Sequence, residues 1–220
     1  MSNTFELFVF DWDGTLMDSI EHIVSSLSAA AADTKMEDLG QHRYRDIIGL
    51  GLAEAMHALY PDATEHDQQL LCERYRHHFL DRNKAQSALF DGAHEMLSSL
   101  REKDVKIAVA TGKARIGLNR VFDETGYGDF FHASRCADES GSKPQPHMLH
   151  ELMSELDVAP EKTIMIGDTT YDMQMANNAG TAGLAVSYGV HDCEQLMQHE
   201  PLACCKDIDE LTHWLHTHST

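Results

Sequence analysis

Two carboxylates, Asp11 and Asp13, stand near the start of the chain with only Trp12 between them. They follow residues 5–10, a nearly continuous apolar run typical of a strand buried on both faces. A carboxylate at the end of such a strand can attack phosphorus and form an aspartyl-phosphate. A second carboxylate two residues later can protonate a leaving oxygen and afterwards activate water. The pair therefore indicates a nucleophile beside an acid–base group.

Polar residues also follow other apolar runs. Two apolar stretches end near residues 110 and 166, and a polar segment around residue 142 carries a lysine. The side chains concerned are Thr111, Gly112, Lys143, Asp168 and Asp172. Because ligands bind at the carboxyl ends of strands in doubly wound folds, we expect these groups to meet Asp11 at one edge of a sheet.

This set of groups suits a phosphoryl group. Asp11 and Asp168 offer the hard oxygen ligands that Mg²⁺ prefers. Lys143 would add a second positive charge, and the hydroxyl of Thr111 with nearby backbone N–H groups can hold phosphate oxygens. Cations and donors placed around a transferring phosphoryl group stabilise the charge of its transition state.

The elements that must position these groups follow from the apolar periodicity. From residue 90 onward strands and helices alternate, which predicts a parallel sheet with helices on both faces. Residues 20–88 carry apolar residues at helical spacing, which predicts about four helices, and no convincing strand interrupts them. We expect a doubly wound α/β core from residues 1–16 plus 89–220, with an all-helical domain, 17–88, inserted in it. Asp91 is the predicted N-cap of a helix within 90–104.

Composition narrows the possible partners. The chain has 220 residues and a formal charge of −19, so it repels nucleic acids and anionic membranes, and we expect neither as a partner. An anionic substrate would need a local cation. The chain has five cysteines, an odd number, and none of them form a C-x-x-C motif. We therefore expect no disulfide framework, and this favours a cytoplasmic location.

Four segments resemble the motifs of the haloacid dehalogenase superfamily, in that family's order. They are "DWDGT" at 11–15, "ATGK" at 110–113, "SKPQP" at 142–146 and "GDTTYD" at 167–172. The last two look especially like the phosphoglycolate phosphatase-like branch. The resemblance covers nearly the whole chain. It implies a Rossmann-like core and a mobile helical cap that closes over the site and excludes water.

The resemblance implies roles for the four aspartates. Asp11 would be the nucleophile and a Mg²⁺ ligand. Asp13 would be the general acid and base and would give its backbone carbonyl to the metal. Asp168 would be a further metal ligand, and Asp172 would support either the metal site or the lysine.

The resemblance also implies phosphate-binding and substrate-binding residues. Thr111, Gly112 and Lys143 would bind the phosphoryl group, and Thr111 and Lys143 would take part in catalysis. In the cap, Gly49 and Gly51 fit a loop that approaches the substrate with its backbone. Arg45 could reach a substrate carboxylate or remain in solvent.

Several reactions share this scaffold. Dehalogenases of the family lack the second acid of the first motif, so Asp13 disfavours dehalogenation. Related phosphomutases tend to carry an arginine where this chain has Leu52, which makes a mutase the less favoured alternative. Hydrolysis of a small phosphorylated metabolite remains, with 2-phosphoglycolate as the leading substrate and a nucleotide or sugar phosphate as the alternative.

Two other classes of protein remain to be weighed. A catalytically quiet binding or regulatory member would have lost a site residue, whereas Asp11, Asp13, Lys143 and Asp168 are all present. A receiver-like signalling protein would need neither the helical insertion nor Asp13. The sequence leaves the oligomeric state open.

Overall fold

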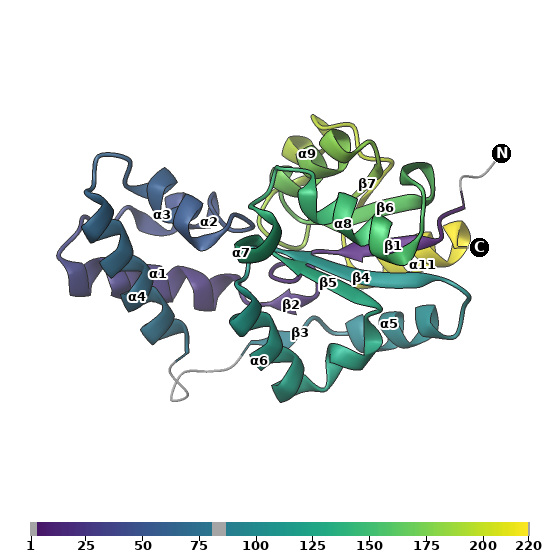
Figure 1. The fold of residues 1–220 in the computed structure, drawn as a ribbon, viewed down its shortest axis with the longest axis horizontal. Helices are drawn as coiled ribbons and strands as arrows, with labels where there is room; N and C mark the ends of the chain where they lie inside the picture. Colours follow the sequence, from purple (N-terminus) through teal and green to yellow (C-terminus); the bar gives the residue numbers. More distant parts are fainter. Residues whose placement is uncertain (1–3, 81–86, 220) are drawn as a thin grey trace.

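The computed structural model describes residues 4–80 and 87–219 (Figure 1). Within these residues a six-stranded parallel sheet has the order β5-β4-β1-β6-β7-β8. Its strands are β1 (Leu7–Phe10), β4 (Lys106–Thr111), β5 (Ala133–Cys136), β6 (Thr163–Gly167), β7 (Ala182–Val186) and β8 (Cys204–Cys205). The predicted doubly wound parallel sheet is confirmed.

Both faces of the sheet are covered by helices because the strand residues alternate between two hydrophobic clusters. Phe8 and Phe10 pack with α5 (Ala93–Arg101), α6 (Arg115–Thr125) and α11 (Ile208–His218). Leu7 and Val9 pack on the opposite face with α8 (His147–Leu156) and α9 (Thr170–Ala179). The shorter helices are η1 (Tyr127–Phe130), α7 (Ala137–Ser140), η2 (Pro160–Lys162) and α10 (Cys193–Met197).

A group of four helices, called here the helical block, lies beside the sheet (Figure 1). It consists of α1 (Ile20–Thr34), α2 (Gly40–Arg45), α3 (Leu52–Leu59) and α4 (Glu65–Phe79). Leu27, Met56 and Leu71 belong to its own hydrophobic cluster. The chain passes into and out of the block through an antiparallel pair, β2 (Met17–Asp18) and β3 (Ala88–Leu89). The sequence analysis predicted four helices in this stretch and missed the two short strands.

Two details differ from the sequence analysis. The predicted N-cap Asp91 is wrong: helix α5 begins at Ala93, one residue later than an N-cap at Asp91 would place it. The N-cap is Gly92, which takes the left-handed conformation at φ 84°. Cys193 and Cys204 are joined as a disulfide across α10 and β8, with their Cα atoms 6.1 Å apart. This is one bridge rather than a framework. Among the described helices, none combines the length and apolar character needed to cross a membrane.

Candidate active site

The polar groups predicted to meet do so where the order of the sheet reverses. Strands β1 and β6 are neighbours at that point, and Asp11 and Asp168 follow them directly. Thr111 ends β4 on the other side of β1, and Lys143 lies in the loop between α7 and α8. All four side chains are buried. This is the crevice in which open α/β sheets bind ligands.

Lys143 lies between two carboxylates. Its Nζ is 2.7 Å from Oδ1 of Asp11 and 2.6 Å from Oδ1 of Asp172. Burial lowers the pKa of the ammonium group, but the two carboxylates outweigh this effect and hold the pKa above its ordinary value. The other oxygen of Asp172 accepts hydrogen bonds from the backbone N–H and the hydroxyl of Thr169, at 3.0 and 2.7 Å. Asp172 therefore both caps helix α9 and holds the lysine.

Asp168 is fixed by hydrogen bonds from two segments. The hydroxyl of Thr15 donates to Oδ1 at 2.8 Å, and the backbone N–H of Val190 donates to Oδ2 at 2.9 Å. Burial raises the pKa of Asp168 to about 7, and the charge of Asp172 adds to this rise. Gly14 has φ 81°, and a Cβ at this position would lie 2.2 Å from Oδ2 of Asp168. The first motif therefore needs glycine here.

The aspartates suit a divalent cation. Asp11, Asp168 and Asp172 each offer an oxygen within 4.8 Å of the others. Oδ2 of Asp11 is buried and accepts no hydrogen bond from the described residues. Burial raises the pKa of Asp11 well above its ordinary value, as do the nearby carboxylates, and Lys143 opposes the rise. Three carboxylates this close together offer the hard oxygen donors that fit Mg²⁺.

Asp13 has a separate set of partners. Its Oδ1 accepts a hydrogen bond from Ser19 at 2.5 Å, and its Oδ2 lies 2.9 Å from Nζ of Lys113. The same ammonium group lies over the ring of Phe79 in α4, 4.7 Å from the ring centroid. Lys113 thus links the predicted acid–base residue to the helical block. This lysine belongs to the "ATGK" segment, but the sequence alone assigned it no role, and it did not reveal Ser19 and Thr15 as partners of the aspartates.

The loop before α3 rests on the core. The backbone N–H of Gly51 donates to Oγ of Ser142 at 2.8 Å, beside the predicted phosphate ligand Lys143. A Cβ on Gly112 would lie 2.4 Å from the carbonyl oxygen of Leu50. The helical block is therefore seated on the loops that carry the predicted phosphate-binding residues.

A cavity of about 250 Å³ lies between the helical block and the core. Asp11, Asp13 and Thr111 contribute to its lining from the core, and Gly49 contributes from the helical block. Arg45 does not line this cavity; it forms an exposed ion pair with Glu21 at 3.1 Å. Of the three predicted substrate contacts in the cap, the structure brings Gly49 to the cavity, seats Gly51 on the core and leaves Arg45 at the surface.

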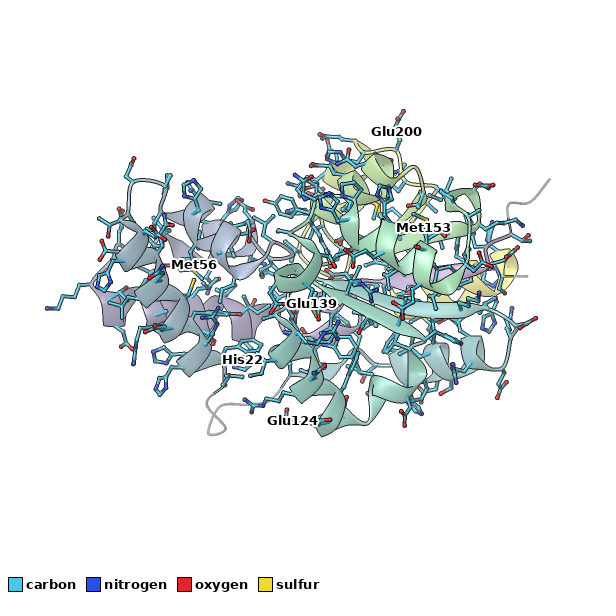
Figure 2. The ribbon with its side chains drawn as sticks, in the orientation of Figure 1. His22, Met56, Glu124, Glu139, Met153 and Glu200 are labelled. Atoms are coloured by element: carbon cyan, nitrogen blue, oxygen red, sulfur yellow. A yellow bond between two sulfur atoms is a disulfide. The ribbon has the colours of Figure 1, made fainter. Side chains whose placement is uncertain are left out.

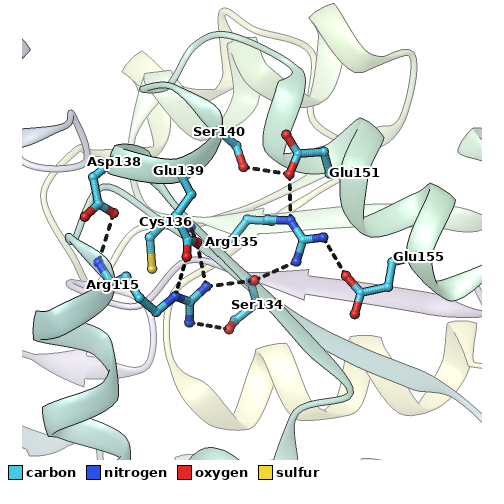
Figure 3. A network of polar contacts seen from close by, with 9 residues as sticks. All are labelled: Arg115, Ser134, Arg135, Cys136, Asp138, Glu139, Ser140, Glu151 and Glu155. Atoms are coloured by element: carbon cyan, nitrogen blue, oxygen red, sulfur yellow. Dashed lines mark hydrogen bonds and ion pairs between the residues drawn. The ribbon is translucent and has the colours of Figure 1, made fainter.

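A surface network braces the segment that leads to Lys143 (Figure 3). Arg115 of α6 donates to both carboxylate oxygens of Glu139 in α7, at 2.8 and 2.7 Å. Arg135 of β5 donates to Glu151 of α8 at 2.7 Å. The first ion pair ties α7, which precedes the lysine loop, to α6, and the second ties β5 to α8, which follows the loop. The hydroxyl of Ser140 in α7 also donates to Glu151 at 2.8 Å.

Comparison with known proteins agrees with this geometry. Residues 8–186 match the family described as haloacid dehalogenase-like hydrolase, and the chain belongs to that family. The probable phosphatase IndB of Dickeya dadantii (strain 3937) is 32% identical over 209 residues, covering 93% of this chain and 91% of the relative. The predicted enzyme class, a phosphoric monoester hydrolase, agrees with this relative's name.

Two further relatives differ in the substrates that they are named for. Pyrophosphatase PpaX of Halalkalibacterium halodurans is 27% identical over 204 residues, covering 92% of this chain and 93% of that protein. The crystal structure of a predicted phosphoglycolate phosphatase from Haemophilus somnus 129PT has a TM-score of 0.85 at 20% identity, covering 96% of this chain and 97% of that one. At this identity the structural likeness shows the fold.

Proposed function

We propose that this protein is a Mg²⁺-dependent phosphatase that hydrolyses a small, phosphoglycolate-like phosphate monoester through an aspartyl-phosphate on Asp11. The observation that carries the proposal is the state of the Asp11 carboxylate. One oxygen pairs with Lys143, while Oδ2 is buried and accepts no hydrogen bond among the described residues. An oxygen in this condition, in the lining of a cavity, is suited to attack phosphorus.

The first half of the reaction transfers the phosphoryl group to the protein. Oδ2 of Asp11 forms the new bond to phosphorus as the bond to the alcohol oxygen breaks. Lys143 and the hydroxyl of Thr111 hold the phosphoryl oxygens, and the backbone at Gly112 supplies a further donor. Asp13 gives its proton to the departing alcohol, helped by its position in the same cavity.

The second half restores the enzyme. Asp13 takes a proton from a water molecule, whose oxygen attacks the phosphoryl group on Asp11 and releases inorganic phosphate. Asp11, Asp168 and the backbone carbonyl of Asp13 would hold Mg²⁺, with Asp172 supporting the site. When bound, Mg²⁺ supplies positive charge that attracts the phosphate and stabilises the transition state.

The helical block has its own part in this proposal. We treat residues 17–88 as a cap domain and residues 1–16 plus 89–220 as the catalytic core. The cap closes over the phosphoryl group and excludes water during the first step. The contact of Gly51 with Ser142 supports this arrangement, since it joins the two parts beside Lys143.

Phosphate release from a panel of compounds tests the proposal. The panel contains 2-phosphoglycolate, a nucleoside monophosphate, two sugar phosphates and pyrophosphate, each with Mg²⁺. Wild type is expected to release phosphate from at least one monoester, and chelation of the metal is expected to stop this reversibly. Asp11→Asn is expected to be folded and inactive. Acid-quenched Asp13→Asn is expected to carry the mass of one phosphoryl group.

Each outcome bears on a separate part of the proposal. Activity retained in Asp11→Asn would contradict the assignment of Asp11 as the nucleophile. Activity that is unchanged by a chelator would contradict the proposed dependence on Mg²⁺. Interconversion of sugar phosphates without net phosphate release would replace the phosphatase by a mutase, and hydrolysis of pyrophosphate alone would replace the monoester.

A further inference from the structure

The cavity above Asp11 has an apolar wall on the side of the helical block. Lining residues of this wall include Ile23 and Leu27 of α1, Met56 of α3, and Tyr75 and Phe79 of α4. Figure 2 shows two other positions of this lining, His22 of α1 and Glu124 of α6, on the facing sides of the block and the core. A volume of about 250 Å³ lies just below the range of about 300–1,000 Å³ typical of drug-sized ligands, so the cavity suits a small alcohol.

Three rings form a stacked row on this wall. The ring of Phe79 is stacked on His22 with centroids 4.5 Å apart, and on Tyr75 with centroids 5.6 Å apart. The ammonium group of Lys113 lies over the same Phe79 ring and also pairs with Asp13. The aromatic row therefore stands directly beside the residue that would protonate the leaving alcohol.

The mouth of the cavity is apolar as well. Leu80, which follows α4, is 42% exposed, and Ile116 in α6 is 81% exposed. They line the cavity from the helical block and from the core, respectively. Because both exposed apolar side chains line the same cavity, they extend its apolar lining to the surface, where such residues can mark a ligand-binding groove.

The cations near the acid cluster are already paired. Lys143 pairs with Asp11 and Asp172, and Lys113 pairs with Asp13. Two arginines also line the cavity: Arg120 pairs with Glu124 at 2.7 Å, whereas Arg76 of α4 is exposed and has no ion pair among the described residues. Away from the exposed Arg76, a carboxylate or a polyol on the leaving group would lose water against a wall made largely of hydrocarbon, which costs free energy.

We propose that the leaving alcohol of the substrate has an apolar body, alkyl or aromatic, and that Phe79, Leu80 and Ile116 bind it. The inference rests on the proposed phosphatase activity and names the class of its alcohol. Phosphoglycolate was expected from core motifs, whereas these residues belong to the cap wall and the cavity mouth. The inference keeps the reaction of the proposed function but replaces its phosphoglycolate-like substrate: phosphoglycolate and sugar phosphates should rank below simple alkyl and benzyl phosphates.

A homologous series of esters tests the inference without changing the chemistry of the reacting oxygen. Ethyl, butyl and hexyl phosphate and benzyl phosphate are compared with glycerol 3-phosphate and 2-phosphoglycolate. We expect kcat/KM to rise about fourfold for each added methylene until the cavity is full, the factor that corresponds to about 0.8 kcal/mol. Binding of the matching alkylphosphonates, measured by calorimetry, is expected to follow the same order.

Two substitutions of exposed apolar side chains distinguish binding of the alcohol at this cavity from a general effect of surface hydrophobicity. Ile116→Ser is expected to flatten the dependence on chain length. Leu202→Ser, at a position that is 50% exposed and outside the cavity lining, is the matched control and is expected to keep it. Neither side chain is buried, so neither change removes core packing.

The outcomes are distinguishable. If no phosphate ester of any kind is hydrolysed with Mg²⁺ and no phosphonate binds, the proposed function fails and this inference fails with it. If esters are hydrolysed but kcat/KM is flat or falls with chain length, only the inference is overturned. A preference for 2-phosphoglycolate that is lost in Arg76→Ala would show that the cavity binds a substrate carboxylate through Arg76, and it would overturn the inference of an apolar alcohol.

Discussion

Lys113 is the residue whose partners the sequence did not reveal. Its ammonium group contacts a carboxylate of the core and an aromatic ring of the helical block at the same time. The lysine side chain is only 10% exposed, so its charge is poorly solvated and depends on Asp13. We regard it as a positioning residue: it holds the Asp13 carboxylate in place only when the helical block is seated.

Replacing this lysine is expected to slow the step that needs a proton. Lys113→Met should lower kcat/KM for alkyl phosphates by about 10- to 100-fold, less than the roughly 10²- to 10⁴-fold that general acid–base catalysis provides, because Asp13 is misplaced and not removed. The kcat/KM for nitrophenyl phosphate, which reports phosphoryl transfer and not the later hydrolysis of the phosphoenzyme, should be affected much less, because nitrophenolate leaves without protonation. Steady-state kinetics on the two kinds of ester make the comparison.

The conservative variant Lys113→Arg is the control and should recover part of the rate. An equal loss on both kinds of ester would mean that the lysine serves the structure generally. No loss on either would remove the positioning role.

At the scale of elements, the network of ion pairs around α7 determines how firmly the lysine loop is held. Hydrogen bonds from Arg115 keep the pKa of Glu139 below its ordinary value of 4.5. A carboxyl whose pKa is lowered by folding stabilises the folded state at neutral pH. This contribution is lost as the pH falls through the folded-state pKa.

The ion pair between Arg115 and Glu139 is expected to make a small, pH-dependent contribution to the free energy of unfolding. Arg115 and Glu139 are 28% and 38% exposed, so solvent screens their attraction, and the pair should contribute about 1 kcal/mol or less. Glu139→Gln should lower the free energy of unfolding by that amount near neutral pH. The difference from wild type should shrink below about pH 4.5, toward zero where the carboxyl is protonated in both states.

Urea denaturation across this pH range measures the effect, and a double-mutant cycle with Arg115→Met isolates the pair. A Glu139→Gln difference that stays constant from neutral to acid pH would show that the carboxyl's charge is not what stabilises α7.

At the scale of the whole molecule, the contact between the helical block and the core depends on a missing side chain. A methyl group on Gly112 would lie 2.4 Å from the Leu50 carbonyl oxygen and 2.6 Å from that of Gly49. Both obstacles are backbone atoms, so the loop itself must move.

Gly112→Ala is therefore expected to displace the helical block. We expect kcat/KM to fall by about tenfold or more, since a small misplacement of catalytic groups has effects of this size. Small-angle X-ray scattering should give a larger radius of gyration. Gly128→Ala, whose Cβ would find ordinary contacts from 3.4 Å outward, is the control. An unchanged kcat/KM and an unchanged radius would contradict the tight seating of this loop.

The sequence predicted most of what single segments determine. Asp11, Lys143 and Asp168 could be placed at one edge because each follows a recognisable apolar run or motif. Lys113 could not be paired with Asp13, because that contact depends on how distant segments pack. The outward position of Arg45 depends in the same way on the packing of α2. Strand β8 was missed because two residues carry too little periodicity to predict a strand.

The β2–β3 pair described above has a practical meaning for protein engineering. The chain leaves the core at Met17 and returns at Leu89, and these two residues are direct partners across the pair. A segment with adjoining ends can be exchanged for another without moving its flanks. The helical block can therefore be exchanged as a unit: blocks from related chains, spliced at this pair, should change the preference for the alcohol if they keep the contacts with Gly112, Lys113 and Ser142.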